Sequence, residues 1–505
     1  MPQRNMTPKF KIILNTIYQF SGRVMSGLVS VVIVKLISNY LGVAGYGEYA
    51  STYEFLSFFA IFADMGIFTI AVREMSLYED DKKMLSKIFG NILSIRLILT
   101  IIMMILAVGA LFLIPQYGVT RIPHAGIIAS FVTLATMMTG TLSAVLQLFL
   151  KMGKATAAFL IGKGIILAYM LYAVLYAYKD NPDMGFFHLY VAGILGGIVT
   201  VALTAYFANK YVKIRLRFDF DYWKEIIWKA APYGAAIILN QVYFRVDSIL
   251  LLLIKGPAEV GIYAVPMRIL EVLTVISFFF MNATLPTLTR AFKTGVEEAR
   301  KVIQFAFNFL TMAGAPIIVG GFILAYPIIF IISSPEFLSR VDEGFYGSDI
   351  AFKILTIALV GAYLSTLFTY ILVATEKQKL VLWINGAGAL FNVIANIIII
   401  PEFGARGAAY TSVASEALIV IIAATICYKS LKIRIDFVPL FKIMLSATVM
   451  GVAVYFLRDP SYHFFGLQNK NVLFLIPLGG IIYLGMLVLT GMLTKETFKN
   501  LKANG

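Results

Sequence analysis

A stretch of nine residues near the start of the chain returns, altered but in register, in its middle. Gly42 to Ala50 reads GVAGYGEYA and Gly256 to Ala264 reads GPAEVGIYA, so Gly, Ala, Gly, Tyr and Ala recur at one constant offset. Farther along, residues 185–214 and 404–433 match in hydropathy, and both end on Lys-Ile. Membrane proteins built from two related halves usually hold a cavity between the halves and work by rocking one half against the other. The repeat therefore points to a membrane transporter.

The chain is too apolar for an ordinary soluble protein. Its 505 residues are 60% hydrophobic and only 14% charged, whereas soluble domains carry about 25% charged residues. Its apolar runs reach about 20 residues, the length that a helix needs to cross a bilayer. A membrane barrel would instead need short segments of alternating polarity, and the sequence does not have them. We therefore expect an all-α polytopic membrane protein.

Fourteen apolar segments are long enough to be membrane spans. Spans 1–6 form one half of the repeat and spans 7–12 the other, which predicts an N-terminal lobe over residues 1–214 and a C-terminal lobe over 215–434. Residues 435–505 then hold two appended spans and a tail. Because each half has an even number of spans, both halves enter the membrane in the same orientation. The spans lie near residues 12–41, 46–72, 84–114, 124–150, 155–178, 186–210, 224–255, 258–290, 301–332, 350–375, 378–400, 404–431, 437–457 and 471–493.

The distribution of charge predicts how the chain lies in the membrane. The net charge is +15, and most basic loop residues lie on the side of the N-terminus. Because positive loops stay in the cytoplasm, we expect both termini to be cytoplasmic and the protein to lie in the inner cell membrane. The location of these basic residues in loops on one side accounts for the net charge of +15, so we expect no nucleic-acid partner. The first apolar stretch is long and no small-residue cleavage site follows it, so we interpret it as an uncleaved span.

Eight basic residues lie within or close to the predicted spans. Charges inside a bilayer are costly and by default indicate a pathway or a site. Lys35, Lys229 and Lys353 lie near span ends, where a long side chain can reach the interface. Arg23 differs, because it lies about eleven residues into span 1, roughly 16 Å along the helix and close to the midplane. The candidates for contact with an anionic substrate are Arg23, Arg96, Lys163, Arg245 and Arg268.

Polar residues also follow one face of span 1. They recur at i, i+4 and i+3 spacing, within about 80° of the helix circumference. Such a face either lines a water-filled cavity or joins helices through hydrogen bonds, and the midplane Arg23 favours the cavity. Span 7, which corresponds to span 1 in the second half, is polar as well. The predicted cavity stripe consists of Asn15, Gln19, Ser26 and Ser30 together with Asn240 and Gln241.

Acidic residues within the spans are candidates for sensing a coupling H⁺ or Na⁺. For Arg245 with Asp247, and for Arg268 with Glu271, a purely structural ion pair is an equally open interpretation, since pairing is how membrane charges are usually tolerated. Beyond such an ion we expect no cofactor, because one Cys and three His argue against a metal cluster. The candidate coupling residues are Glu54, Asp64, Asp247 and Glu271.

Arg and Lys inside a membrane suit one class of ligand. Phosphate and pyrophosphate groups are bound by charge-assisted hydrogen bonds, and Arg can bind two oxygens at once. A cationic cavity in a transporter therefore predicts an anionic substrate.

Short motifs in both halves resemble a known family. In their order and spacing they resemble the signature of polysaccharide-repeat-unit (Wzx-like) flippases, a branch of the multidrug/oligosaccharidyl-lipid/polysaccharide (MOP) exporter superfamily. Each motif alone is only weakly specific for the family. Taken together, the resemblance covers nearly the whole chain. The motifs are Leu41-Gly42, Gly45-Tyr46-Gly47, Tyr49, Asp64-Met65-Gly66 and Arg73-Glu74 in the first half, and Val260 to Tyr263, Arg268, Glu271, Pro286 and Pro401 to Ala409 in the second.

The resemblance implies a fold and a function. The fold would be two pseudo-symmetric six-helix lobes (MATE/MOP-like) around a central cavity, plus two C-terminal helices. The function would be that of a flippase, not an enzyme, which moves polyprenyl-(pyro)phosphate-linked oligosaccharide repeat units from the cytoplasmic to the outer leaflet by alternating access. Arg23 and the other four basic candidates would contact the lipid phosphate. Expected partners are this substrate, membrane lipids and glycosyltransferases or a polymerase of the same pathway, with the flippase itself a monomer.

Other functions remain open at this point. A peptidoglycan-precursor (lipid II) flippase is the nearest alternative, although the Asp64-Met65-Gly66 and Arg73-Glu74 pattern favours the polysaccharide branch. A cation-coupled multidrug exporter of the same superfamily usually has twelve spans and an acidic cavity, which fits less well. A membrane glycosyltransferase or polymerase would need a large extramembrane loop or a catalytic constellation, and Gly153-Lys154 and Gly162-Lys163 lack the spacing of a phosphate-binding loop. A structural scaffold would not need matched polar faces in both halves.

Overall fold

The computed structural model describes residues 8–78, 80–465 and 468–493 of the chain. Helices make up almost all of this part, and it contains no β-strand beyond a single bridge between Arg340 and Phe345. The chain divides into two compact units, Met1–Gly261 and Ile262–Gly505, each described by itself below. The predicted all-α architecture is thereby confirmed.

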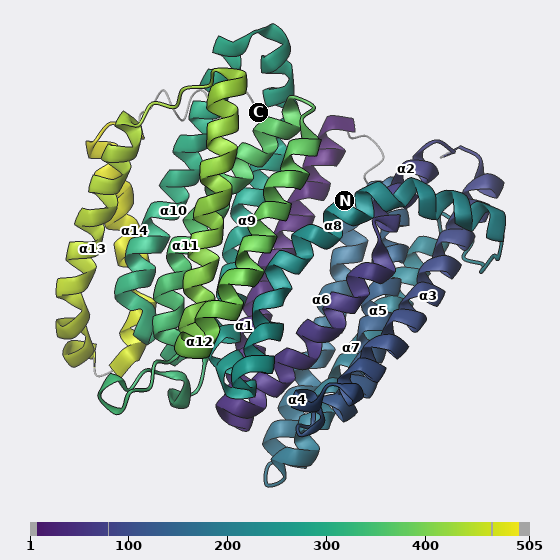
Figure 1. Cartoon of the computed structure of the whole chain (residues 1–505), viewed down its shortest axis with the longest axis horizontal. Coiled ribbons are helices and arrows are strands. Elements are labelled where there is room, and N and C mark those ends of the chain that lie inside the picture. Colours follow the sequence, from purple (N-terminus) through teal and green to yellow (C-terminus); the bar gives the residue numbers. More distant parts are fainter. Residues whose placement is uncertain (1–7, 79, 466–467, 494–505) are drawn as a thin grey trace. The chain divides into compact units, whose positions relative to one another are not determined.

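The first unit is built around one long, kinked helix. Helix α1 packs against α3, α5, α6 and α8, while α7 packs against α5 and α6 (Figure 1). A short π-helical turn, Ala173–Ala177, continues α6. The helices of this unit are α1 (Pro8–Asp64), α2 (Ile67–Ser76), α3 (Lys82–Leu113), α4 (Pro115–Gly118), α5 (Ile122–Leu148), α6 (Met152–Tyr172), α7 (Pro182–Asn209) and α8 (Phe220–Lys255).

The second unit contains the remaining long helices. Helix α10 packs against α11 and α13, α11 packs against α12, and α13 packs against α14. Short 3₁₀ turns at Pro335–Phe337, Val341–Glu343 and Gln468–Asn471 connect them. These helices are α9 (Pro257–Thr294, whose first turn lies in the first unit), α10 (Val296–Ile332), α11 (Ser348–Ala374), α12 (Gln378–Leu431), α13 (Val438–Phe465) and α14 (Val472–Leu489).

Glycine kinks allow two of the helices to cross a membrane twice. Helix α1 has 57 residues and α12 has 54, and at 1.5 Å per residue each is more than twice as long as about 30 Å of hydrocarbon is thick. The α1 backbone leaves helical geometry at Gly42, where φ is 66°, and the α12 backbone does so at Gly404, where φ is 56°. Glycine adopts these positive φ angles without the steric cost of a Cβ atom. Each long helix therefore accounts for two adjacent predicted spans.

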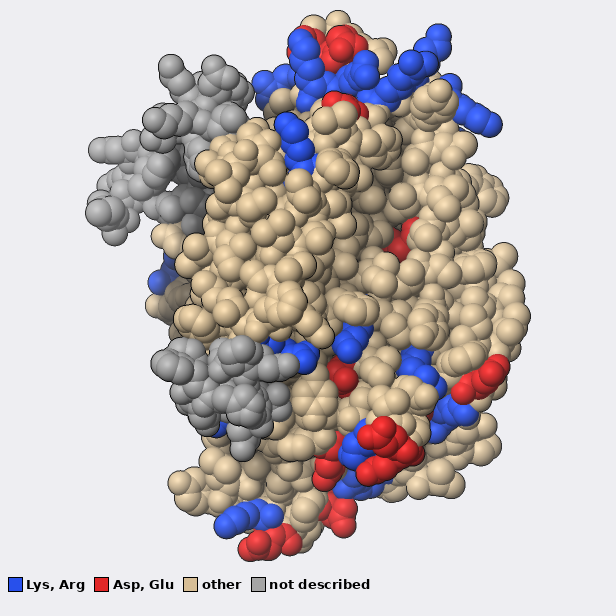
Figure 2. All heavy atoms as spheres, turned by 90° about the vertical axis from the view of Figure 1, so that its left-hand side faces the viewer, with Lys and Arg blue, Asp and Glu red and all other residues tan. Residues whose placement is uncertain are grey.

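The described helices have the length and polarity of membrane spans. Eleven helical stretches of the described chain are long and apolar enough to cross a bilayer, and Tyr18–Ser76 and Gln378–Leu431 among them contain the kinks. Figure 2 shows one face of the molecule with charged side chains gathered at the top and scattered over the lower half, and with a broad, mostly uncharged band between them. Hydrocarbon requires such a band. The protein is a multi-pass membrane protein.

One predicted span is interrupted. We expected span 2 to run unbroken over residues 46–72, but α1 ends at Asp64 and α2 starts at Ile67. Met65 and Gly66 between them both have positive φ, 40° and 75°. Gly234 of α8 lies against this break, since a Cβ atom there would be 2.6 Å from the Met65 carbonyl oxygen. The backbone is thus turned directly after the Asp64 side chain.

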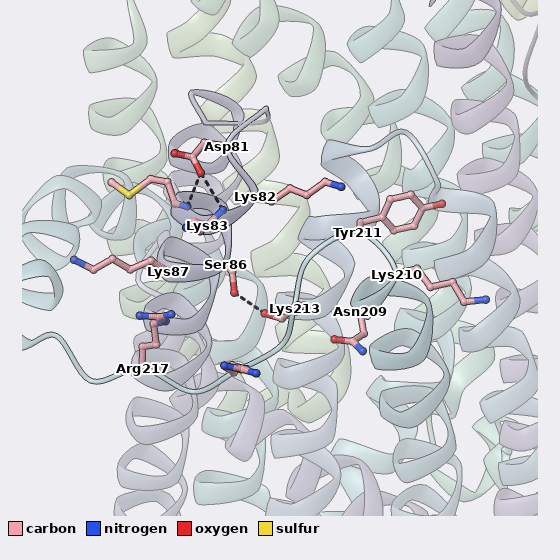
Figure 3. A pocket seen from close by; sticks show the side chains of 12 residues that line it. Asp81, Lys82, Lys83, Ser86, Lys87, Asn209, Lys210, Tyr211, Lys213 and Arg217 are labelled. Carbon is pink, nitrogen blue, oxygen red and sulfur yellow. Dashed lines mark hydrogen bonds between the residues drawn. The ribbon is translucent and has the colours of Figure 1, made fainter.

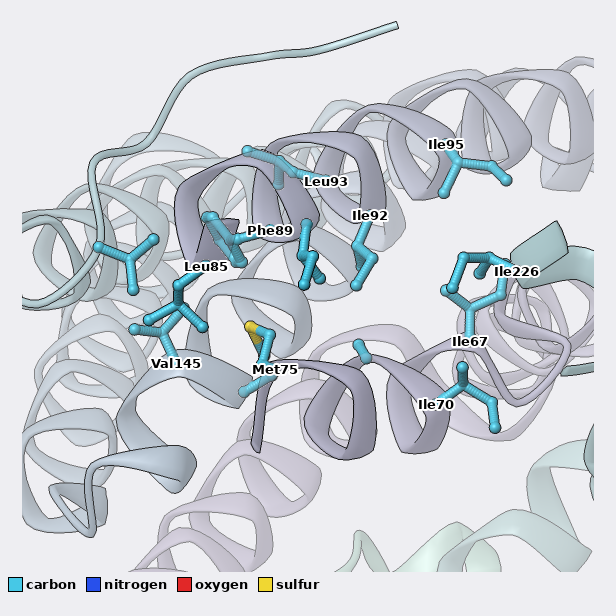
Figure 4. Close-up of a cluster of buried hydrophobic side chains, with 14 of the residues drawn as sticks. Ile67, Ile70, Met75, Leu85, Phe89, Ile92, Leu93, Ile95, Val145 and Ile226 are labelled. Atoms are coloured by element: carbon cyan, nitrogen blue, oxygen red, sulfur yellow. The ribbon is translucent and has the colours of Figure 1, made fainter. Parts of the chain in front are cut away.

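An apolar cluster holds the interrupted segment in place. The buried residues of α2 recur at i, i+3, i+4 and i+8, which places them on one helical face. Figure 4 shows this face, with Ile67, Ile70 and Met75, packed among side chains of α3, with Val145 of α5 and Ile226 of α8 also in the cluster. Helix α8 thus belongs to the first unit by packing. The lobe boundary predicted at residue 214, which rests on the sequence repeat, stays a prediction.

Candidate functional site

Several charged side chains on the helices of the first unit pair with opposite charges on other helices. Arg245 of α8 forms a hydrogen-bonded ion pair with Glu54 of α1. Both side chains are mostly buried, with 25% of Arg245 and 11% of Glu54 exposed. One candidate substrate contact is therefore paired with one candidate coupling residue, and the pair connects α1 to α8.

Arg96 of α3 is the most deeply buried of the five basic candidates. Its guanidinium pairs with Asp64, donates a 2.9 Å hydrogen bond to the Thr141 hydroxyl of α5, and lies 5.8 Å from the Phe68 ring centroid. Only 4% of Arg96 is exposed. Asp64 is the last residue of α1, directly before the turn at Met65 and Gly66. This site satisfies the guanidinium with a carboxylate, a hydroxyl and an aromatic face.

Lys163 of α6 contacts the polar face of α1. Its Nζ donates hydrogen bonds to the Ser26 hydroxyl at 2.8 Å, the Ser30 hydroxyl at 2.6 Å and the Ser26 carbonyl oxygen at 3.2 Å. Two serines of the predicted stripe thus bind a cation from the neighbouring helix. The hydroxyl oxygens accept hydrogen bonds from the ammonium and orient it.

Arg23 lies one turn before Ser26, and the Arg23 side chain is exposed. Next to it, Gly22 packs against Thr156 of α6, where a Cβ atom would overlap the threonine methyl group. Gln19 is half-buried. Three further members of the predicted stripe, Asn15, Asn240 and Gln241, lie outside the residues whose side chains the structure describes.

The remaining candidates lie on α8 and α9. Arg268 pairs with Glu271 one turn later, with 2.9 Å between Nη1 and Oε2, and both side chains are partly exposed. Asp247 and Ser248 on α8 are buried. The ion pair that we considered for Arg268 and Glu271 is therefore present. For Arg245 the structure shows a partner that the sequence did not suggest, Glu54.

An arginine that sequence reasoning placed in a loop also connects three helices of the first unit. Arg121, directly before α5, binds Glu48 of α1 through Nε at 2.7 Å and Nη2 at 2.6 Å, and Asp183 of α7 through Nη1 at 2.8 Å. Its guanidinium lies 4.2 Å from the Phe186 ring centroid. No local motif marks this contact, because its three charged members are far apart in the sequence.

The second unit contains a buried polar cluster that we also did not predict. Asn396 donates a 3.0 Å hydrogen bond to Asn392 one turn earlier, and Thr411 donates one of 2.5 Å to Asn396 across the kink of α12. All three residues are buried. The i, i+4 asparagines in an otherwise apolar run could have signalled it. Such a cluster joins the two halves of α12 by hydrogen bonds.

Comparison with known sequences identifies a family. Residues 12–292, more than half of the chain, match the profile of the polysaccharide biosynthesis protein family, and residues 232–398 match the MatE profile. A protein of Shigella flexneri described as a candidate O-antigen transporter is 19% identical over 412 residues, which cover 79% of this chain and 93% of that protein.

Solved structures have the same fold. The lipid II flippase MurJ in an inward closed conformation has a TM-score of 0.73 at 15% identity, covering 94% of this chain and 98% of that one. An inward-facing multidrug resistance MATE family transporter of the MOP superfamily has a TM-score of 0.61 at 15% identity, covering 83% and 95%. The predicted MATE/MOP-like architecture is confirmed. The chain thus belongs to the polysaccharide biosynthesis protein family, in the Wzx-like branch of the MOP superfamily of flippases and transporters.

Proposed function

We propose that the protein is a flippase that moves polyprenyl-(pyro)phosphate-linked oligosaccharide repeat units from the cytoplasmic to the outer leaflet by alternating access. The family assignment and the transporter relative support a polysaccharide precursor as substrate. The similarity in fold to the lipid II flippase MurJ supports a lipid-linked substrate. The peptidoglycan precursor lipid II is the second candidate substrate for the same reason.

One observation carries the proposed substrate chemistry. Along one face of α1, the exposed Arg23 is followed by Ser26 and Ser30, which hold the Lys163 ammonium by hydrogen bonds of 2.8 and 2.6 Å. Two cations from adjacent helices therefore lie within two helical turns of each other along α1. A diphosphate presents several oxygens to such a pair and accepts charge-assisted hydrogen bonds from both. We propose Arg23 and Lys163 as the first phosphate contacts.

The ion pairs suggest how an ion could take part. Arg96, Arg245 and Arg268 are each joined to a carboxylate, respectively Asp64, Glu54 and Glu271. Binding of H⁺ or Na⁺ at such a carboxylate would release its arginine toward a phosphate, and departure of the ion would restore the pair. We propose that these three pairs exchange partners in this way during transport.

The location in the cell is part of the proposal. The excess of basic residues in alternate loops supports an inner-membrane protein with both termini in the cytoplasm. A flippase so oriented would receive its substrate from the glycosyltransferases and deliver it to the polymerase of the same pathway. We propose that it functions as a monomer.

Flipping of a fluorescent polyprenyl-pyrophosphate oligosaccharide in proteoliposomes tests the proposal. At equal protein insertion, we expect Arg23→Ala and Lys163→Gln each to lower the flipping rate by roughly 10- to 100-fold, the cost of losing one charge-assisted hydrogen bond of about 1.5–3 kcal/mol. Lys179→Ala, which removes a cation from an exposed loop, is the matched control. Equal rates in all four proteins would exclude the phosphate role of Arg23 and Lys163.

The same assay separates the candidate substrates. Flipping of lipid II but not of repeat-unit precursors would favour the peptidoglycan-precursor function. If neither lipid is flipped and a cationic dye is exported against a Na⁺ or H⁺ gradient, the proposal is wrong and the multidrug exporter is correct.

A further inference from the structure

A basic pocket lies in the first unit, away from the ion pairs described above. It has a volume of about 830 Å³ and is formed by the first turns of α3 and by residues 210–219, which connect α7 to α8 and are here called the strap (Figure 3). Of its twelve lining residues, Lys82, Lys83 and Lys87 come from α3. Lys210, Lys213, Arg215 and Arg217 come from the strap. Asp81 is the single acidic residue of this lining.

Backbone contacts fix the strap along α3. The Ser86 hydroxyl donates a 2.8 Å hydrogen bond to the Lys213 carbonyl, and the Arg217 amide donates one of 3.0 Å to the Ser94 hydroxyl. Gly90 lies between them against the Arg215 carbonyl, where a Cβ atom would overlap the oxygen. Lys213, Arg215 and Arg217 alternate along the strap and line the same pocket, and all three are exposed.

Two acids at the pocket, Asp81 and Asp219, are engaged with partners of their own. The Asp81 carboxylate caps α3 by accepting hydrogen bonds from the amides of Lys83 and Met84 at 2.9 and 3.0 Å. Asp219 pairs with Lys87 at 3.1 Å. In addition, Lys82 and Lys83 occupy the first turn of α3, where the helix dipole disfavours cations and favours anions. The pocket thus accumulates positive charge at a cost that a bound anion would offset.

The second unit shows that docking of a strap does not require this charge. Residues 432–437 read KIRIDF, against KIRLRFDF at 213–220, and they dock on the first turns of α10. There the Arg300 side chain donates a 2.9 Å hydrogen bond to the Arg434 carbonyl, and the Asp436 amide donates one of 2.7 Å to Gln304. However, α10 begins with two glutamates, and one of them pairs with Lys301 at 2.7 Å. The concentration of cations is therefore specific to the strap of the first unit and is not shared by the equivalent segment of the second.

Exposed apolar side chains identify the source of the anion. Leu216 and Phe218 alternate with basic residues of the strap and are 50% and 56% exposed, and Phe220, which begins α8, is 70% exposed. The segment lies where two predicted membrane helices, α3 and α7, respectively begin and end. A segment with apolar groups beside cations binds at a bilayer surface, with the apolar groups among acyl chains and the cations at phosphates. We propose that this pocket binds the phosphate head group of an anionic phospholipid of the surrounding leaflet, separately from any transported substrate.

Lipid retention by the purified full-length protein tests the proposal. Phosphatidylglycerol is titrated into the protein in neutral detergent, and bound lipid is counted by native mass spectrometry, with phosphatidylcholine as the uncharged comparison. Exchanging Lys213, Arg215 and Arg217 together for Gln should weaken phosphatidylglycerol binding by roughly 100-fold, the fold-change for about 1 kcal/mol per basic residue at an anionic surface. The matched control exchanges Lys429, Lys432 and Arg434 for Gln and should bind like the wild type. Equal binding by all three proteins would overturn the proposal.

A second variant distinguishes binding from folding. Lys82→Gln with Lys83→Gln removes two cations from the start of a helix and should not lower thermal stability. It should still weaken phosphatidylglycerol binding, by roughly tenfold or more. Unchanged lipid binding in this variant would count against the pocket. Inorganic pyrophosphate is the soluble probe: if it binds the wild type as tightly as phosphatidylglycerol and with the same dependence on Lys213, Arg215 and Arg217, the occupant is a free phosphate compound and the lipid assignment is wrong.

Discussion

Gly47 and Gly261 occupy equivalent positions in the internal repeat, and each lies against the backbone of the other repeat copy. A Cβ atom at Gly47 would overlap the Pro257 carbonyl oxygen, and one at Gly261 would overlap the Val43 carbonyl oxygen. Val43 and Pro257 are themselves equivalent in the repeat. The two copies therefore meet reciprocally, as parts related by a twofold axis do. The motif recurs because close packing of two backbones leaves no room for a side chain.

This contact predicts that Gly47→Ala and Gly261→Ala destabilise the protein. The obstacle is backbone rather than a flexible side chain, so each substitution should cost about 1–3 kcal/mol, as overpacking usually does. Thermal unfolding in detergent measures the cost. Gly109→Ala in α3 is the control, because no atom lies near its Cβ position and alanine favours helix there. If Gly47→Ala unfolds at the same temperature as Gly109→Ala, the two repeat copies do not pack as described.

The Asp64–Arg96 pair predicts an asymmetric response to mutation. Asp64→Asn leaves a buried guanidinium without its carboxylate and should cost about 3–5 kcal/mol, whereas exchange of both residues for Leu and Met should recover much of that loss. Glu343→Gln removes one partner of an exposed pair with Arg340 and should cost at most about 1 kcal/mol. Equilibrium unfolding of the four proteins decides the matter. A double variant as unstable as Asp64→Asn would show that the pair does more than neutralise charge.

The sequence predicts the helices of this protein well and the partners of its charges poorly. Apolar runs and the repeat locate nearly every span, because hydropathy alone decides what can cross a bilayer. The interruption at Met65 was missed, since it depends on Gly234 of α8 lying against that backbone. Pairing depends equally on distant residues: Arg245 has Asp247 two residues away in the sequence, yet it also reaches Glu54 on another helix.

The start of α8 should respond to acid. Hydrogen bonding from the Tyr222 amide, and then from Lys87, lowers the pKa of the Asp219 carboxyl below its ordinary value of 3.8. A carboxyl with a lowered folded-state pKa stabilises the fold above the unfolded pKa and loses that contribution as the pH falls through the folded value. Asn also caps helices but does not titrate here. The stability difference between wild type and Asp219→Asn should therefore shrink as the pH is lowered through about 4 and below. A difference that stays constant in thermal scans over this range would contradict the linkage.

The Glu54–Arg245 pair predicts how transport would depend on pH. If proton binding at Glu54 frees Arg245, then Glu54→Gln imitates the protonated state permanently. The variant should flip the polyprenyl-pyrophosphate oligosaccharide without an imposed pH gradient and should no longer respond to one, while the wild type responds. Glu48→Gln is the matched control, because it also removes a carboxylate of α1 that is paired with an arginine, and it should keep the response. Flipping that responds equally to the gradient in all three proteins would show that protons act elsewhere. Loss of all flipping in Glu54→Gln, with normal unfolding, would instead assign the carboxylate a role in positioning Arg245.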